Sequence, residues 1–251
     1  MSDRVICLRD GAFQMDTGLF AQMRAQPDEA SALLNVKELP SNVDVPVYAF
    51  VVETANGPLL IDAGGGSLMG AGFGGVAAGL RRAGFTPEMF TRVLLTHMHG
   101  DHCGGLLDAR GRAAFPNARL AIAKDEIACW TDPDLPEQFR PIAADAKLVL
   151  EAYAGRINVV QPGEAMDGVE IIDAAGHTNG HIAFGFAEAG VIAAGDIVHV
   201  GAVQFARPEW DNDWDMDAAK ARASRHRLIG LSKSRGADLL CAHAGRIRLA
   251  A

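Results

Sequence analysis

Short runs of apolar residues, bounded by glycine, proline and polar residues, recur along this chain of 251 residues. Runs of this length predict buried strands. Two of them flank Asn56-Gly57, the strongest short-range signal for a β-hairpin. The strands predicted in this way cover residues 45–53, 58–62, 93–96, 119–123, 159–160, 169–173, 182–186, 191–194 and 239–242.

The stretches between these strands predict helices, some of which carry start and stop signals. Gly84 ends one helix, and Pro87 stands at the first helical position of the next. The predicted helices cover residues 28–34, 73–83, 86–88, 104–107, 124–130, 142–154 and 217–235. Residues 131–141 hold three prolines and predict a surface loop or lid. Asp10-Gly11 is expected to break residues 4–16 into a small hairpin.

Strands alternate with helices in both halves of the chain. This alternation predicts an α/β fold in which two packed sheets are covered by helices on their outer faces. The sequence contains no short-period repeat, low-complexity tract or linker, and a layered fold of this length is often one domain. We therefore expect a single domain over residues 1–251.

The most informative stretch of the chain lies at residues 96–102 and reads Thr-His-Met-His-Gly-Asp-His. It follows the apolar run 93–95, so it begins where a buried strand ends. Neutral imidazole and carboxylate are ligands that zinc, manganese and iron(II) accept. Four such side chains within six positions predict a metal site, in preference to a polar loop that happens to be rich in histidine.

The spacing of these side chains suggests two metal positions. In an extended loop, residues two apart point the same way, so His97 and His99 can converge on one point. Gly100 allows the chain to turn. Asp101 and His102 can then face a second point close by.

Other ligand-type residues also follow predicted strands, which is where open sheets place their sites. Asp62 ends one strand, and it is expected either to orient a ligand or to cap a turn. The glycines after it do not form a phosphate-binding loop, because no Gly-Lys-Ser/Thr follows them. Seven ligand candidates divide into two metal shells, and they are His97, His99, Asp101, His102, His177, Asp196 and His243.

Composition and charge narrow the class of protein. A formal charge of -8 and the absence of basic runs argue against nucleic acid as a partner. No segment reads as a secretory signal or a membrane span. The cysteines, Cys7, Cys103, Cys129 and Cys241, form no Cys-x-x-Cys pair. They are typical of reduced thiols, and we expect a cytoplasmic protein that binds no membrane.

The order of these motifs resembles the metallo-β-lactamase superfamily. The resemblance rests on His97-x-His99-x-Asp101-His102, then Gly-His177-Thr-x-Gly-His181, Gly-Asp196 and His243. Within the superfamily the chain is similar to the methyl parathion hydrolase group and to quorum-quenching lactonases, over residues 45–248. Ala-Val-Gln-Phe at 202–205 and the Asp-x-Asp before the long helix are more particular to that hydrolase group.

The resemblance implies an αββα sandwich that holds two divalent metal ions, with zinc as the default and manganese, iron or cobalt as alternatives. It implies that His97, His99 and His177 bind the first metal. Asp101, His102 and His243 would bind the second, and Asp196 would bridge the two. A hydroxide held between two such ions would attack a carbonyl carbon or a phosphorus atom, and both metals would stabilise the charge that develops. This chemistry makes Asp101 and Asp196 catalytic as well as metal-binding.

Three residues are candidates for contact with the substrate. Acyl-homoserine lactonases carry a tyrosine three residues after the bridging aspartate, where this chain has His199. His199 is therefore a candidate to contact a substrate oxygen or to donate a proton to the leaving group, with a purely supporting role as the alternative. Trp130 and Phe139 align with aromatic residues of the pocket in the methyl parathion hydrolase group, and core packing is their alternative. His181 is expected to be structural, and His226 exposed.

The chain departs from several branches of the superfamily. Asp196 replaces the thiolate of cysteine-bridged β-lactamases, His99 replaces a glutamate of the di-iron branch, and the basic surfaces of the nuclease branch are missing. The chain also ends soon after His243, where related enzymes continue. This short end could open the pocket or leave an edge for the partner subunit of a homodimer.

These observations predict a binuclear metal-dependent hydrolase of a neutral, fairly apolar ester or lactone, with aryl phosphotriesters as a side activity. A thioester hydrolase of the glyoxalase II kind is the alternative enzyme, although the helical domain that binds glutathione is missing. A metal-binding protein whose catalysis has lapsed is the alternative outside enzymes. The complete ligand set argues against that alternative.

Overall fold

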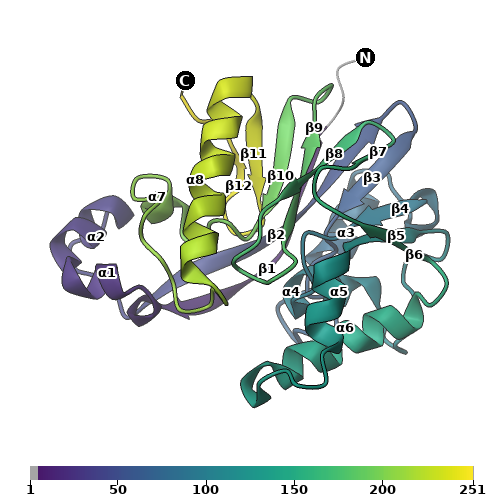
Figure 1. Ribbon diagram of the computed structural model, residues 1–251, viewed down its shortest axis with the longest axis horizontal. Coiled ribbons are helices and arrows are strands. Elements are labelled where there is room, and N and C mark those ends of the chain that lie inside the picture. The colour runs from purple at the N-terminus through teal and green to yellow at the C-terminus, as the bar shows by residue number, and fades with distance from the viewer. Residues whose placement is uncertain (1–4, 251) are drawn as a thin grey trace.

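The computed structural model describes residues 5–250. Two six-stranded sheets pack face to face, and helices cover their outer faces (Figure 1). This αββα arrangement is the α/β sandwich that the sequence predicted. The first sheet has the order β1-β2-β3-β4-β5-β6 and consists of Val5–Asp16, Asn42–Thr54, Gly57–Ile61, Arg92–Leu94, Arg119–Ala123 and Ile157–Val160.

The second sheet has the order β12-β11-β10-β9-β8-β7. Its strands, in that order, are Gly245–Ile247, Asp238–Cys241, Val191–Gly195, Ile182–Phe186, Val169–Asp173 and Ala165–Met166. Both sheets are mixed, because β3 to β6 run parallel in the first and β10 pairs parallel with β11 in the second. The sequence positions its ligand candidates after the carboxyl ends of β4, β8, β10 and β11.

Alternation of side chains along each strand builds the layers. In β2, Phe50 and Val52 face the second sheet, whereas Ala49 and Val51 pack under the helices of the first sheet. The strands are buried on both faces because each sheet has the other sheet on one side and helices on the other. The core therefore has three layers, one between the sheets and one under each set of helices.

The longer helices cover the two outer faces. On the first sheet lie α3 (Gly75–Arg82), α5 (Lys124–Thr131) and α6 (Arg140–Ala152), and on the second lies α8 (Ala218–Arg235). The shorter helices are η1 (Thr17–Leu19), α1 (Ala21–Ala25), α2 (Pro27–Leu34), η2 (Pro87–Met89), α4 (Gly100–Cys103), η3 (Gly104–Leu106), η4 (Glu137–Phe139) and α7 (Gly201–Gln204).

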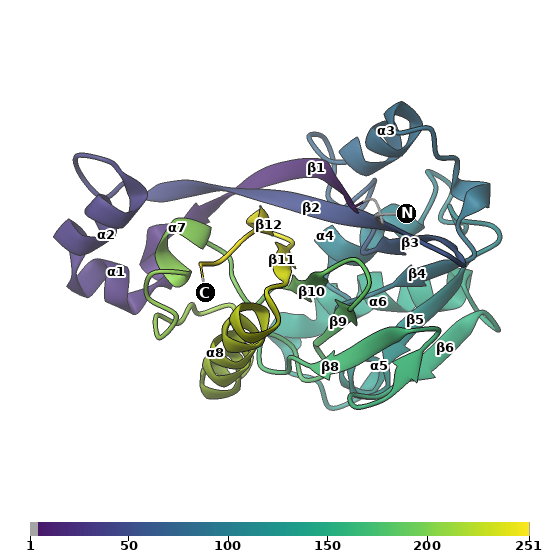
Figure 2. The same ribbon diagram turned by 90° about the horizontal axis from the view of Figure 1, so that it is seen from above.

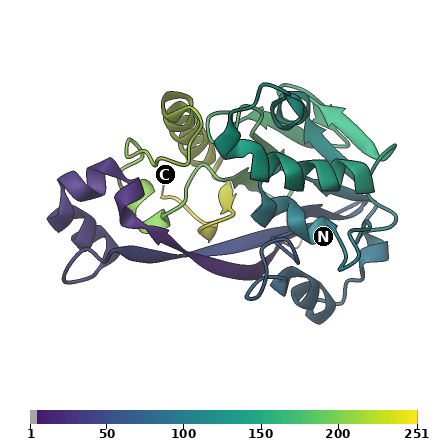
Figure 3. The ribbon, with the colours of Figure 1, turned by 90° about the horizontal axis from the view of Figure 1, so that it is seen from below.

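Strands β1 and β2 form a ribbon that extends past the rest of the first sheet to reach α1, α2 and α7 (Figures 2 and 3). A separate apolar cluster forms where they meet, and it includes Met15, Phe20 and Trp210. The ribbon thus brings residues from the start of the chain next to the loop that precedes α8.

The prediction of a hairpin at residues 4–16 is wrong for the described part, and Arg4 lies outside the described residues. Val5 to Asp16 form one strand, whose register shifts between Arg9 and Gly11. Asp10 lies at this irregularity, and its carboxylate accepts hydrogen bonds from the backbone N–H groups of Gly65, Gly74 and Val76. These bonds explain the polar break in an otherwise apolar strand, because such a shift bends a strand without reversing it.

Other boundaries also differ from the predicted ones. Residues 131–141 are not wholly loop, because they contain η4 and the first residues of α6. The helix expected from Gly104 begins earlier, at Gly100, and continues as a 3-10 turn. Strand β12 was not predicted, and it pairs antiparallel with β11 just after His243. No helix within residues 5–250 combines the length and apolar character that crossing a bilayer requires.

Candidate metal centre

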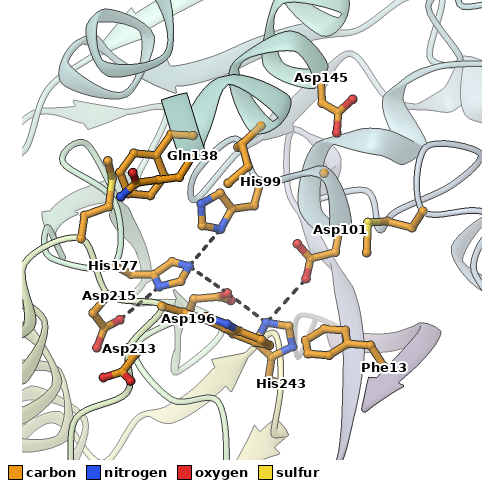
Figure 4. A pocket seen from close by; sticks show the side chains of 16 residues that line it. Phe13, His99, Asp101, Gln138, Asp145, His177, Asp196, Asp213, Asp215 and His243 are labelled. Atoms are coloured by element: carbon orange, nitrogen blue, oxygen red, sulfur yellow. Dashed lines mark hydrogen bonds and ion pairs between the residues drawn. The ribbon is translucent and has the colours of Figure 1, made fainter. Parts of the chain in front are cut away.

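All seven predicted ligands converge at the ends of four strands. The segment after β4 supplies four of them, and single residues follow β8, β10 and β11. Figure 4 shows His99, Asp101, His177, Asp196 and His243 pointing toward one another on the floor of a cavity. The other two, His97 and His102, are fully buried behind them.

Four of the ligand candidates form a first group, in which His97, His99 and His177 surround Asp196. His99 Nδ1 lies 3.0 Å from His177 Nε2, and His177 Nε2 lies 3.4 Å from Asp196 Oδ2. His97 Nε2 approaches the same carboxylate oxygen at 3.8 Å. These are the residues that the resemblance implied for the first metal.

Asp101, His102 and His243 form a second group. Asp101 Oδ2 lies 3.3 Å from His102 Nε2 and 3.6 Å from His243 Nε2. Asp196 joins this group as well, because its Oδ1 lies 3.3 Å from His102 Nε2. One carboxylate therefore borders both groups.

The donor atoms fit a pair of divalent cations. Ligand atoms around a tetrahedral ion with bonds of about 2 Å lie roughly 3.3 Å apart, close to the separations within each group. Three buried donor atoms, His97 Nε2, His102 Nε2 and Asp196 Oδ1, have no hydrogen-bond partner among the described residues. Buried polar atoms are rarely left unpaired, so these atoms are suited to metal coordination.

In four of the ligand histidines, Nδ1 has its own partner. The Nδ1–H of His102 donates to Asp62 Oδ2 at 3.0 Å, that of His177 to Asp215 Oδ1 at 3.1 Å, and that of His243 to the carbonyl of Pro46 at 2.8 Å. His97 Nδ1 lies 3.1 Å from the hydroxyl of Thr96. Because Nδ1 of each of these histidines is engaged by a protein oxygen, Nε2 is the ring nitrogen that remains to coordinate a metal.

Asp62 orients the segment that carries the histidines. Besides His102, it accepts hydrogen bonds from the backbone N–H and the hydroxyl of Thr96. Of the two roles that the sequence left open for Asp62, the structure supports the orientation of a ligand.

Arg225 in α8 and Asp215 in the loop before it support the first ligand group. The guanidinium of Arg225 is fully buried, and it donates to the carbonyl of Ile197 and, at 3.4 Å, to Asp215. Asp215 in turn accepts from His177. The guanidinium of Arg225 thus links the loop of Asp196 to the carboxylate of Asp215, which orients His177.

Glu126 joins the two histidine loops. Its buried carboxylate accepts hydrogen bonds from the backbone N–H of Met98, the hydroxyl of Thr178 and, at 2.6 Å, the indole N–H of Trp130. Trp130 lies against the ring of His99, with centroids 5.5 Å apart, and is not part of the cavity wall. Phe139, the other predicted aromatic residue, does line the cavity.

Burial and mutual charge set the protonation of the cluster. Burial, followed by the charge of His177, lowers the pKa of His99 to about 3. Burial by itself would raise the pKa of Asp196, but the charges of His102 and His243 hold that pKa well below its usual range. Burial opposes a proton on His102, yet Asp196 and Asp101 raise the pKa of His102. The carboxylates thus stabilise positive charge between the two groups, which favours cations there.

Three histidines are not among the predicted ligands. Two of them have the positions that the sequence predicted, and the third, His199, is more deeply buried than expected. His181 Nε2 accepts a hydrogen bond from the backbone N–H of Asp196 at 3.0 Å, so its role is structural as predicted. His226 is exposed, also as predicted. His199 is only 1% exposed and lies behind Asp196, outside the cavity wall. Its predicted contact with substrate is therefore not visible in this structure.

A cavity of about 500 Å³ opens above the two groups. Phe13 from β1 and Trp214 from the loop before α8 form one wall, with ring centroids 5.4 Å apart. Phe139 and Ile142 lie on the side of α6. Among the described residues, the lining includes no lysine or arginine.

Sequence reasoning missed several supporting residues. The Asp-x-Asp motif before the long helix was the only signal for Asp215, and it did not reveal the partner of that carboxylate. Glu126, Asn212 and Arg225 carried no signal, because their partners lie elsewhere in the fold.

Comparisons with known proteins point to one family. The model of the family described as the metallo-beta-lactamase superfamily matches residues 42–243. An N-acyl homoserine lactonase of Bacillus sp is 27% identical over 160 residues, which cover 55% of this chain and 57% of that protein. One of Bacillus cereus is 26% identical over 57% of this chain and 59% of that protein. The matches thus span a little over half of these relatives.

Solved structures match over nearly the whole chain. The crystal structure of AbOPH, a hydrolase in the beta lactamase superfamily, is 29% identical with a TM-score of 0.90, covering 100% of this chain and 91% of that one. AidC, a dizinc quorum-quenching lactonase in complex with a product, shares the fold at 22% identity, with a TM-score of 0.88 and coverage of 99% and 91%. The sandwich fold and the ligand groups at the strand ends agree with the family match over residues 42–243. The chain therefore belongs to the metallo-β-lactamase superfamily.

Proposed function

We propose that this chain is a binuclear metal-dependent hydrolase of neutral, fairly apolar esters or lactones, with aryl phosphotriesters as a side activity. The observation that carries the proposal is the position of Asp196 between two ligand groups, directly below an apolar cavity. The names of the lactonase relatives support a lactone as substrate.

The ligand groups would hold two divalent cations, zinc by default, which would supply Lewis acidity and lower the pKa of water toward neutrality. His97, His99 and His177 would hold one cation, and Asp101, His102 and His243 the other. Asp196 would contact both. Asp62 and Asp215 keep the imidazoles of His102 and His177 in the tautomer that binds metal.

The cavity would select and orient the substrate. Phe13, Trp214 and Phe139 offer apolar surface to an acyl chain or an aromatic leaving group, with the ester held over Asp196. Asp145 and Asp213 also line the cavity, and no lysine or arginine among the described residues balances them there. We therefore expect neutral substrates to bind better than substrates that carry a carboxylate.

The test is a panel of γ-lactones, acyl-homoserine lactones, aryl esters, thioesters and paraoxon-like triesters, assayed with zinc-loaded and chelator-stripped protein. The proposal expects turnover of at least one neutral lactone or ester, lost on stripping and restored by zinc. Two metal equivalents without turnover of any ester, thioester or triester would favour the non-catalytic alternative. Turnover of thioesters alone would favour the glyoxalase II kind of reaction.

A further inference from the structure

His199 lies against the metal centre without belonging to either group of predicted ligands. Its ring is stacked on that of His243, with centroids 5.3 Å apart, and its Nε2 lies 3.6 Å from Asp196 Oδ2. That nitrogen is buried and has no hydrogen-bond partner among residues 5–250. Asp196, His199 and His243 are close enough together to form a third group of potential ligands.

The other ring nitrogen shows which tautomer His199 adopts. Its Nδ1 lies 3.0 Å from Nδ2 of the buried Asn212. Asn212 Oδ1 accepts a hydrogen bond from the backbone N–H of Trp214 at 2.8 Å. Because a backbone N–H can only donate, the amide oxygen must face Trp214, and the amide NH₂ must face His199. His199 Nδ1 is therefore an acceptor.

A neutral imidazole carries one proton, so the proton of His199 lies on Nε2. This is the opposite tautomer to that of His102, His177 and His243, whose Nδ1–H groups donate to protein oxygens. Their Nε2 atoms can bind a metal, whereas Nε2 of His199 carries a hydrogen and cannot. Loss of that hydrogen would leave an imidazolate, so His199 is also unsuited to proton transfer to a leaving group.

We propose that His199 is a fixed N–H donor that positions Asp196, and that Asn212 sets its tautomer. The inference rests on the proposed function, because it assigns Asp196 to the metals. Asp196 Oδ2 lies 3.6 Å from this unpaired Nε2, which is longer than a hydrogen bond in this structure, and the burial of His199 behind the cavity wall favours action through this carboxylate over contact with substrate. Gln204 supports the arrangement, since its Oε1 accepts from the backbone N–H of His199 at 2.7 Å.

The tautomer can be measured directly. Long-range ¹H–¹⁵N spectra of the zinc-loaded protein should show His199 protonated on Nε2, with His102, His177 and His243 protonated on Nδ1. Asn212→Asp replaces the donor by an acceptor and should move the His199 proton to Nδ1. Asn56→Asp, in the exposed hairpin turn, adds the same charge far from the site and should change nothing. An Nδ1–H tautomer in the unsubstituted protein would overturn the proposal, and so would an unchanged tautomer in the folded Asn212 variant.

Metal affinity separates the possible roles of His199. His199→Phe should bind two equivalents of zinc but lose roughly 10- to 100-fold in affinity, with the KM of an ester substrate little changed. His199→Gln keeps an N–H donor and should retain most of the affinity. A drop to one equivalent would identify His199 as a ligand. An altered KM at unchanged affinity would place it in contact with substrate. Since the spectra and the zinc titration need no substrate, failure of this inference is distinguishable from failure of the proposed hydrolase activity.

Discussion

Asp196 faces both ligand groups, because its Oδ2 lies near His97 and His177 while its Oδ1 lies 3.3 Å from His102. Asp196→Ala should remove the shared carboxylate, so the bound metal should fall below two equivalents and hydrolysis of p-nitrophenyl acetate should be lost. Elemental analysis and the ester assay check this.

The control for this substitution is Asp173→Ala, which removes an exposed carboxylate that pairs with Arg227. It should keep both metals and full activity. An Asp196 variant that behaved like this control would contradict the assignment of the shared ligand.

Asp62 offers a more selective test, because it contacts the imidazole of His102 directly and reaches that of His97 only through the hydroxyl of Thr96. Asp62→Asn should weaken the hydrogen bond that orients the ring of His102. The zinc affinity of the group formed by Asp101, His102 and His243 should then fall by about 10- to 100-fold. The other group should be affected much less. Competition with a graded series of chelators would show one weakened site, and equal weakening of both would contradict the role given to Asp62.

Among single residues, the sequence revealed the metal ligands better than the residues that hold those ligands in place. His177 and His243 could be recognised because ligand-type residues recur immediately after apolar runs. Asn212 and Arg225 could not, because the feature that gives each its role is a partner in another loop. Trp130 was expected on the cavity wall by alignment, yet its N–H bonds to Glu126 and turns the ring toward the core.

Close contact between two elements holds the loop of His177 in place. Gly180 lies so near the start of α5 that a Cβ added there would be 1.9 Å from the backbone nitrogen of Glu126. Gly180→Ala should therefore force these elements apart and destabilise the protein, by about 1–3 kcal/mol as for other overpacked sites. Urea unfolding of the metal-free protein measures the effect.

Gly230 provides the matched control for this change. It lies within α8, where an added Cβ would meet no atom within 4 Å beyond its chain neighbours and the backbone of its own helix. Gly230→Ala should stabilise the protein by roughly 0.5–1 kcal/mol, because alanine loses less backbone entropy in a helix. Destabilisation of both variants to the same extent would show that the contact at Gly180 is not the cause.

Most elements could be predicted from local pattern, and the exceptions have physical causes. The hairpin at Asn56-Gly57 and the strand Arg119–Ala123 follow from turn chemistry and an apolar run. Asp10-Gly11 has the same local appearance as a turn, but the polar side chain serves distant backbone N–H groups and the strand continues. Strand β12 is too short and polar to be recognised without its neighbour β11.

For the whole molecule, the buried histidines predict how the stability of the metal-free protein depends on pH. Burial is the largest cause that lowers the pKa values of four of them, which are His97, His99, His181 and His199. Below about pH 6.5 the unfolded chain binds protons that these folded histidines exclude, so stability should fall as the pH falls.

Two other histidines act in the opposite direction. Burial opposes their protonation, but the nearby carboxylates prevail and raise the pKa values of His102 and His243. Their contribution is fully present below about pH 6.5 and is lost as the pH rises through the folded values. The Tm of chelator-stripped protein should therefore pass through a maximum near neutral pH.

The zinc-loaded protein should lack the decline on the alkaline side, because cations replace the protons on His102 and His243. Scanning calorimetry from pH 5 to 9, with and without zinc, checks the decline of Tm on the acidic side and on the alkaline side. A flat profile for the stripped protein would show that these side chains do not titrate as the burial and the carboxylates require.

The apolar walls of the cavity come from other segments than the metal ligands on its floor. Its ligands stand on strand ends inside the sandwich, whereas Phe13 comes from the long ribbon, Phe139 from η4 and Trp214 from the loop before α8. Mutations in these three peripheral segments can therefore reshape the acyl-binding space without replacing a metal ligand. Substrate preference can therefore evolve through successive substitutions in the cavity wall, and each intermediate protein keeps its metal ligands.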